Sequence, residues 1–150
     1  MPIDFAYKRT PAYRVALLTR TGAWNEKKLR GQFAELSAWA KKNRLRVGHW
    51  FFFEPDMRTF IAGLEIRGKA KGTGRIRLRT LPAATVATVT FDPDVISPRI
   101  IYHGIYDYLR WQKKAKEIRK AVSYREVYSG DPWSSPKVWS KTEIQVVVQK

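Results

Sequence analysis

The sequence predicts an α+β domain: a tandem strand-helix-strand-strand repeat forming an antiparallel sheet, with two helices on one face and a central cleft on the other. Strand-like and helix-like segments occur twice in the same order, and a Gly/Lys-rich stretch separates the two sets. The 150 residues, 44% of them hydrophobic, suffice for one domain with a core. We expect a single domain over 1–150, with repeat one at about 12–67, a linker at 68–80 and repeat two at about 81–149.

Repeat one opens with a β-rich segment at 13–19, followed by a turn in which Asn25 is a candidate helix N-cap. Apolar residues then recur at three- and four-residue spacing, which predicts an amphipathic helix ending near Arg44. These residues are Leu29, Phe33, Leu36 and Ala40. The apolar run 47–53 predicts a strand that stops at Glu54-Pro55-Asp56, and 60–67 predicts the next strand.

The linker begins with the Gly/Lys-rich segment 68–74, which predicts a loop or hinge. Residues 75–79 then alternate basic and apolar side chains. This alternation predicts an edge strand with a basic outer face.

Repeat two opens with the β-branched segment 85–91, which predicts a strand. Ser97-Pro98 is typical of a helix start, because serine caps the helix and proline suits its first position. Apolar residues at helical spacing extend this helix to about Ala121; they are Ile101, Ile105, Tyr108, Trp111, Ala115 and Ile118. Segments 124–128 and 142–149 predict the last two strands.

Composition narrows the function classes. Two histidines and no cysteine make a metal site improbable, and we expect no cofactor. No run of 18 apolar residues is present, so we expect a cytoplasmic protein without a membrane partner. The net charge of +16 favours polyanions such as nucleic acid or an acidic protein. The alternative is a basic surface with no dedicated partner.

The segment 124–128 carries the most distinctive pattern. As a strand it places Tyr124, Glu126 and Tyr128 on one face and Arg125 and Val127 on the other. An unpaired buried carboxylate is costly. Glu126 therefore either lines a pocket for an aromatic or cationic molecule, or forms a salt bridge with one of the many basic residues.

In order and spacing, several segments resemble the GyrI-like small-molecule-binding superfamily, which includes the effector-binding domains of AraC-type and MerR-type multidrug-responsive regulators. They are Arg14-Val15-Ala16, Thr21-Gly22, Phe33-Ala34-Glu35-Leu36, 81–87, Arg125-Glu126-Val127-Tyr128, Asp131-Pro132 and Thr142-Glu143-Ile144. The resemblance covers roughly 12–149. No helix-turn-helix precedes residue 12, so we expect a stand-alone module.

The resemblance implies an aromatic-walled cleft between the repeats, in which a central glutamate receives hydrophobic cations. Glu126 matches that position, between Tyr124 and Tyr128. The strand 50–53 would form the opposite wall. Trp50, Phe52 and Trp133 are candidate lining residues, although aromatic side chains in strands are as often part of the core.

Two other functions stay open. The cations that flank both predicted helices could make a basic helical face for nucleic acid or an acidic protein. Some relatives of this fold are hydrolases, in which case Glu126 would be the general base and Tyr124 or Tyr128 a proton donor. We expect binding rather than catalysis. Glu143 is expected to be solvent exposed.

Overall fold

The computed structural model describes residues 4–150, which form two compact units. The first-half unit is Ala12–Pro82, and the second-half unit comprises residues 4–11 and 83–150. The elements in chain order are β1 (Ala6–Thr10), β2 (Tyr13–Thr21), α1 (Glu26–Lys42), β3 (Arg46–Asp56), β4 (Thr59–Arg67), β5 (Arg77–Leu81), β6 (Ala84–Phe91), α2 (Pro98–Lys114), β7 (Lys120–Tyr128), α3 (Pro136–Trp139) and β8 (Thr142–Gln149). The predicted α+β class with antiparallel strands is confirmed.

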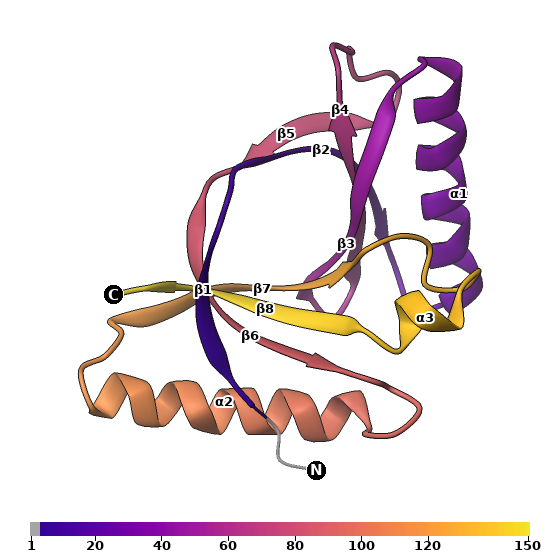
Figure 1. The fold of residues 1–150 in the computed structure, drawn as a ribbon. Coiled ribbons are helices and arrows are strands. Elements are labelled where there is room, and N and C mark those ends of the chain that lie inside the picture. The colour runs from indigo at the N-terminus through magenta and orange to yellow at the C-terminus, as the bar shows by residue number, and fades with distance from the viewer. Residues whose placement is uncertain (1–3) are drawn as a thin grey trace. The chain divides into compact units, whose positions relative to one another are not determined.

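In the first-half unit the strands pair antiparallel in the order β3-β4-β2-β5, and α1 runs along them (Figure 1). The helix begins where the sequence predicts, because the Asn25 side chain accepts a hydrogen bond of 3.0 Å from the Lys28 backbone N–H. The Gln32 amide on the buried side of α1 donates to the carbonyl oxygens of Leu18 and Phe60, at 2.8 and 3.0 Å. These bonds hold α1 against β2 and β4.

Side chains of β3 alternate between the two faces of this sheet. The Trp50 ring stacks on Phe33 of α1, with ring centroids 4.8 Å apart. Phe51 and Phe53 stack on each other at 6.0 Å on the opposite face, around Gly63 of β4. A Cβ at position 63 would lie 3.1–3.3 Å from neighbouring side chains, so glycine lets the apolar side chains close over the strand.

The predicted strand break at Glu54-Pro55-Asp56 is wrong. β3 continues to Asp56, and its pairing with β4 shifts register between Phe53 and Asp56. Proline lacks a backbone N–H, and a bulge is one of the places where a strand tolerates it. The basic segment does form the edge strand of this unit, as β5.

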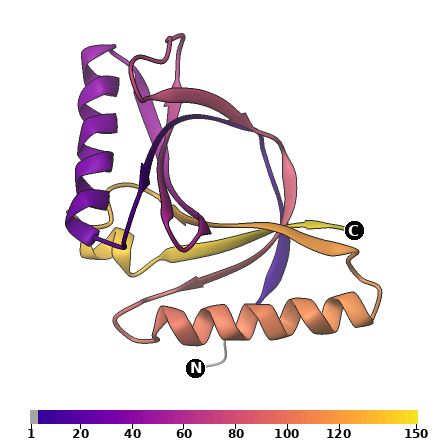
Figure 2. The same cartoon turned by 180° about the vertical axis from the view of Figure 1, so that it is seen from behind.

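In the second-half unit the strands pair antiparallel in the order β1-β6-β8-β7. Figures 1 and 2, seen from opposite sides, both place α2 alongside β6. The helix begins at the predicted Ser97-Pro98 cap. Its buried side packs on strand residues to form the core of the unit, which consists of Ala87, Val89, Phe91, Ile101, Ile105, Leu109, Ile118, Ile144, Val146 and Val148.

The predicted length and inward stripe of the second helix are partly wrong. The helix ends at Lys114, and Lys116 has a φ of 61°, which turns the chain toward β7. Ile118 belongs to the buried core, but it lies in the connection between α2 and β7 and not in the helix. Trp111 is 64% exposed, whereas Leu109 takes the inward position four residues after Ile105.

Two elements have no counterpart in the sequence prediction. The strand β1 precedes the predicted first repeat, yet it pairs with β6 of the second half, from Ala6–Thr88 to Thr10–Ala84. The short helix α3 lies between β7 and β8. The runs β2-α1-β3-β4 and β6-α2-β7-β8 share the order strand, helix, strand, strand, apart from α3 in the second run. The internal repeat and the central cleft stay predictions.

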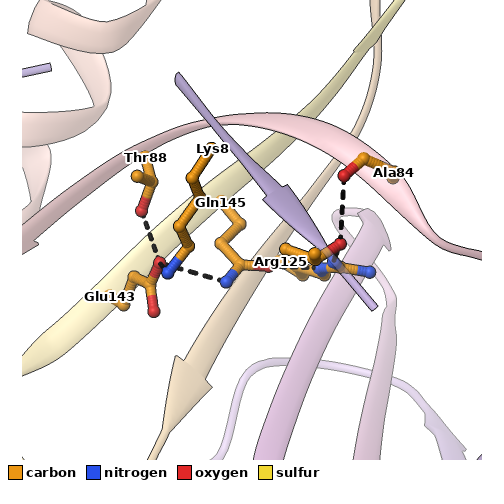
Figure 3. Close-up of polar contacts among 7 residues, drawn as sticks. Lys8, Ala84, Thr88, Arg125, Glu143 and Gln145 are labelled. Carbon is orange, nitrogen blue, oxygen red and sulfur yellow. Dashed lines mark hydrogen bonds and ion pairs between the residues drawn. The ribbon is translucent and has the colours of Figure 1, made fainter. Parts of the chain in front are cut away.

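A polar network covers the face of the second-half sheet opposite α2 (Figure 3). The Glu143 carboxylate accepts from Thr88 and from Lys8 and Gln145, at 2.6 and 3.0 Å. The Gln145 amide oxygen accepts from Arg125 Nε at 2.7 Å. The prediction that Glu143 is solvent exposed is therefore wrong, since its side chain is 16% exposed.

The far end of the network reaches β1. Arg125 donates to the Thr10 hydroxyl at 3.4 Å, and Thr10 donates to the Ala84 carbonyl oxygen at 3.2 Å (Figure 3). Arg125 and Gln145 are 5% and 2% exposed. A buried guanidinium needs such acceptors, because charge without hydrogen bonds is costly in the interior. The network thus joins all four strands of the unit.

The Glu143→Gln variant is expected to lower the free energy of unfolding by about 1–2 kcal/mol near neutral pH, because it removes charge-assisted hydrogen bonds. Burial raises the pKa of Glu143, but hydrogen bonds from Lys8, Thr88 and Gln145 and the Lys8 charge outweigh it and hold the pKa below 4.5. This stabilisation is complete above 4.5 and is lost as pH falls through the lowered value. Urea denaturation across this pH range measures the difference.

The exposed Glu117→Gln serves as the control and should leave the unfolding free energy unchanged within about 0.5 kcal/mol. A difference in unfolding free energy between wild type and Glu143→Gln that does not shrink as pH falls from above 4.5 through the lowered pKa would contradict this account.

Candidate functional site

The candidate site is centred on Glu126 of β7. Glu126 pairs with Ile144 and Tyr124 pairs with Val146, and both partners belong to the core that faces α2. Arg125 pairs with Gln145 on the opposite face, within the polar network. The predicted alternation along this strand is therefore confirmed.

Two tyrosine hydroxyls donate to the Glu126 carboxylate. Tyr102 of α2 donates to Oε1 at 2.9 Å, and Tyr128 of β7 donates to Oε2 at 3.0 Å. Glu126 and Tyr102 are half-buried, whereas Tyr128 is 7% exposed. These bonds orient the carboxylate.

Tyr124 and Tyr128 stay protonated well above neutral pH. Burial, and then the charge and hydrogen bond of Glu126, raise the pKa of Tyr128 far above its usual value of 10.0. Burial, with the nearby Tyr106, raises the pKa of Tyr124 to about 12. These hydroxyls are therefore persistent hydrogen-bond donors and poor acids.

An aromatic pair extends the site along β7. The Tyr124 and Tyr106 rings lie 5.1 Å apart, and Tyr106 stands one helical turn after Tyr102 on α2. Glu126 thus lies on the helix-covered face of its sheet. The prediction that Glu126 lies on the face away from the helices is wrong. Glu126 pairs with Ile144 of β8, and Ile144 belongs to the core that packs against α2, so both side chains lie on the helix-covered face.

The other predicted lining residues have different surroundings. Trp50 stacks on Phe33, and Phe52, 8% exposed, makes an edge contact with Trp24, so both contribute to packing in the first-half unit. Trp133 is half-buried in the loop after β7, where its backbone N–H donates to Asp131 at 2.9 Å. A role for these three aromatic residues in ligand binding stays a prediction.

Tyr102 is the residue at this site that sequence reasoning missed. It lies beside Ile101 on α2 and looks like a continuation of the apolar stripe. The signal was the four-residue spacing of Tyr102 and Tyr106, which places two tyrosines on one helix face.

Within residues 4–150, no three or more His, Asp and Glu side chains form a group placed to hold a metal ion. Over the same residues, no helix has the length and apolar character needed to cross a membrane.

The family model of the GyrI-like small molecule binding domain matches residues 4–149. The chain therefore belongs to the GyrI-like family. The search of curated protein sequences found no match.

Solved structures share the fold at low sequence identity. The EcmrR chain in the EcmrR–DNA complex superposes with a TM-score of 0.73 at 19% identity, over 99% of this chain. This chain spans 58% of that EcmrR chain. The EcmrR C-terminal domain superposes with a TM-score of 0.66 at 18% sequence identity, over 100% of this chain and 99% of that domain. SAV2435, solved bound to tetraphenylphosphonium, superposes with a TM-score of 0.56 at 9% sequence identity, over 97% of this chain and 94% of the SAV2435 chain.

The Tyr128→Phe variant is expected to lower the free energy of unfolding by about 1–2 kcal/mol, because it removes a buried hydroxyl that donates to Glu126. Chemical denaturation measures the loss. The matched control is Tyr106→Phe on the half-exposed side of α2, for which we expect a change within about 0.5 kcal/mol. Equal losses in the two variants would show that the Glu126 contact adds no stability.

Proposed function

We propose that the protein binds a hydrophobic organic cation at Glu126, as a ligand-sensing domain. The observation that carries this proposal is the Glu126 carboxylate held by two tyrosine hydroxyls on an aromatic face. Membership of the GyrI-like small-molecule-binding family supports it, as does the tetraphenylphosphonium complex of SAV2435.

The chemistry of this face suits a lipophilic cation. Faces of tyrosine rings attract cations through the ring quadrupole. Tyr102 and Tyr128 contact the carboxylate, and the Tyr106–Tyr124 ring pair lies further along the same helix and strand. A half-buried carboxylate attracts a cation more strongly than one in bulk water does, because the local dielectric constant is lower. An apolar ligand body would at the same time bury surface against these rings.

The surroundings of Tyr128 favour binding over hydrolysis. A general acid needs a pKa near the working pH. Burial and Glu126 raise the pKa of Tyr128, which moves it away from neutral pH. Use of Glu126 as a general base is the alternative, and turnover of a ligand that binds at the site would support it.

The role of this domain in a larger system is also a proposal. The similarity to EcmrR, whose solved complex contains DNA, suggests that ligand binding serves regulation. The basic helical faces, including Lys41 and Lys42 of α1 and Lys113 and Lys114 of α2, stay a predicted contact for nucleic acid or an acidic protein.

Tetraphenylphosphonium should quench the intrinsic tryptophan and tyrosine fluorescence of the wild type, and Glu126→Gln should weaken its binding by about tenfold or more. The substitution removes the charge and keeps the shape of the side chain. Neutral triphenylphosphine oxide should bind wild type and variant alike, because its attraction does not depend on the carboxylate charge.

Glu35→Gln on α1 is the matched control, since it removes the same charge from the first-half unit and should leave binding unchanged. Equal affinity of wild type and Glu126→Gln for tetraphenylphosphonium would refute Glu126 as the anchor. An equal loss in the Glu35 variant would attribute the effect to net charge.

A further inference from the structure

A hollow lies within the first-half unit. It encloses about 580 Å³, within the range of small-molecule sites. Residues of β2, β4, β5 and the turn before β5 line it: Leu17, Thr19, Ile61, Gly74, Arg75, Arg77 and Arg79. The alternation of residues 75–79 predicts these arginines only as the outer face of an edge strand.

Strand register explains why these side chains converge. Arg77 of β5 stands opposite Leu17 of β2, and Thr19 of β2 stands opposite Ile61 of β4. Directly paired residues share a face of an antiparallel sheet, and so do residues two apart, which adds Arg79. Leu17 lies beside Gly63 together with Phe51 and Phe53, so this face is the one opposite α1.

The lining combines an apolar floor with a guanidinium wall. Leu17 and Ile61 are half-buried strand residues and supply the floor. Arg75 donates to both carboxylate oxygens of Glu35, at 3.1 and 3.3 Å, so an acid already offsets its charge. Across residues 4–150, Arg77 and Arg79 have no ion-pair partner. Their charges therefore remain available to a ligand.

We propose that this hollow binds an organic anion, a phosphate or carboxylate group carried on an apolar body. Guanidinium groups match the oxygens of either anion with two parallel hydrogen bonds, and the apolar body would cover Leu17 and Ile61. An inorganic ion would leave that floor exposed to water. This site takes a ligand of charge opposite to that proposed for Glu126, and it belongs to the other unit.

The probe is 8-anilinonaphthalene-1-sulfonate, an anion on an aromatic body whose fluorescence rises in an apolar site. Arg77→Gln/Arg79→Gln should weaken its binding by about tenfold or more, because two charge-assisted contacts are lost. Ile61→Thr keeps a β-branched strand residue but makes the floor polar, and should weaken binding severalfold. Thermal unfolding of each variant checks that the fold is kept.

The control is Arg99→Gln/Arg119→Gln, which removes the same charge from exposed positions of the second-half unit. It should change probe affinity by less than about twofold. Equal weakening by the two double variants would overturn the proposal, since binding would then follow net charge. No effect of Ile61→Thr would also overturn it, because the floor would contribute nothing.

Competition identifies the chemical group. Displacement of the probe by phenyl phosphate or by benzoate, at concentrations where inorganic phosphate fails, supports the proposal and shows which anion is preferred. Equal displacement by inorganic phosphate, or stronger displacement by a short single-stranded DNA, overturns it. Tetraphenylphosphonium binding should be unchanged in Arg77→Gln/Arg79→Gln, so either proposal can fail without the other.

Discussion

The opposed placement of Arg125 and Glu126 on β7 is the constraint on which the second-half unit depends. Arg125 is buried and donates to Gln145 and Thr10, while Glu126 meets Tyr102 on the other face. A register slip of one residue would move a guanidinium under α2 and bring a second carboxylate beside Glu143. Both outcomes would bury poorly compensated charge. The polar network on one face thus holds the proposed binding carboxylate on the other.

The two units offer opposite chemistries in a chain of net charge +16. The second-half unit presents a carboxylate among tyrosines, and the first-half unit presents arginines above an apolar floor. In each case the alternation of side chains along a strand gathers one kind of side chain on one face of the sheet. Tyr102 of α2 adds to the carboxylate face, and Arg75 of the turn before β5 adds to the arginine face. Net charge alone would have indicated only polyanions. The local arrangement is the basis for proposing a cation at Glu126 and an anion at the hollow of the first-half unit.

Local patterns predicted the elements that local interactions determine. Asn25 and Ser97-Pro98 mark the helix starts, because caps act on backbone groups within a few residues. The end of α2 was missed, because Ile118 continues the helical spacing although Lys116 has already turned the chain. The strand β1 was missed for a different reason. Its partner β6 lies more than seventy residues away, as the Thr10–Ala84 hydrogen bond shows.

The sequence by itself determined that Glu126 shares a strand face with Tyr124 and Tyr128, because side chains alternate along any strand. It also determined the family pattern that drew attention to this face. Only the tertiary structure decided that α2 covers that face, that Tyr102 donates to the carboxylate, and that Arg77 lies opposite Leu17. The physical reason is that these contacts join segments distant in the chain. Periodicity sets what one strand presents, whereas pairing and packing set what it meets.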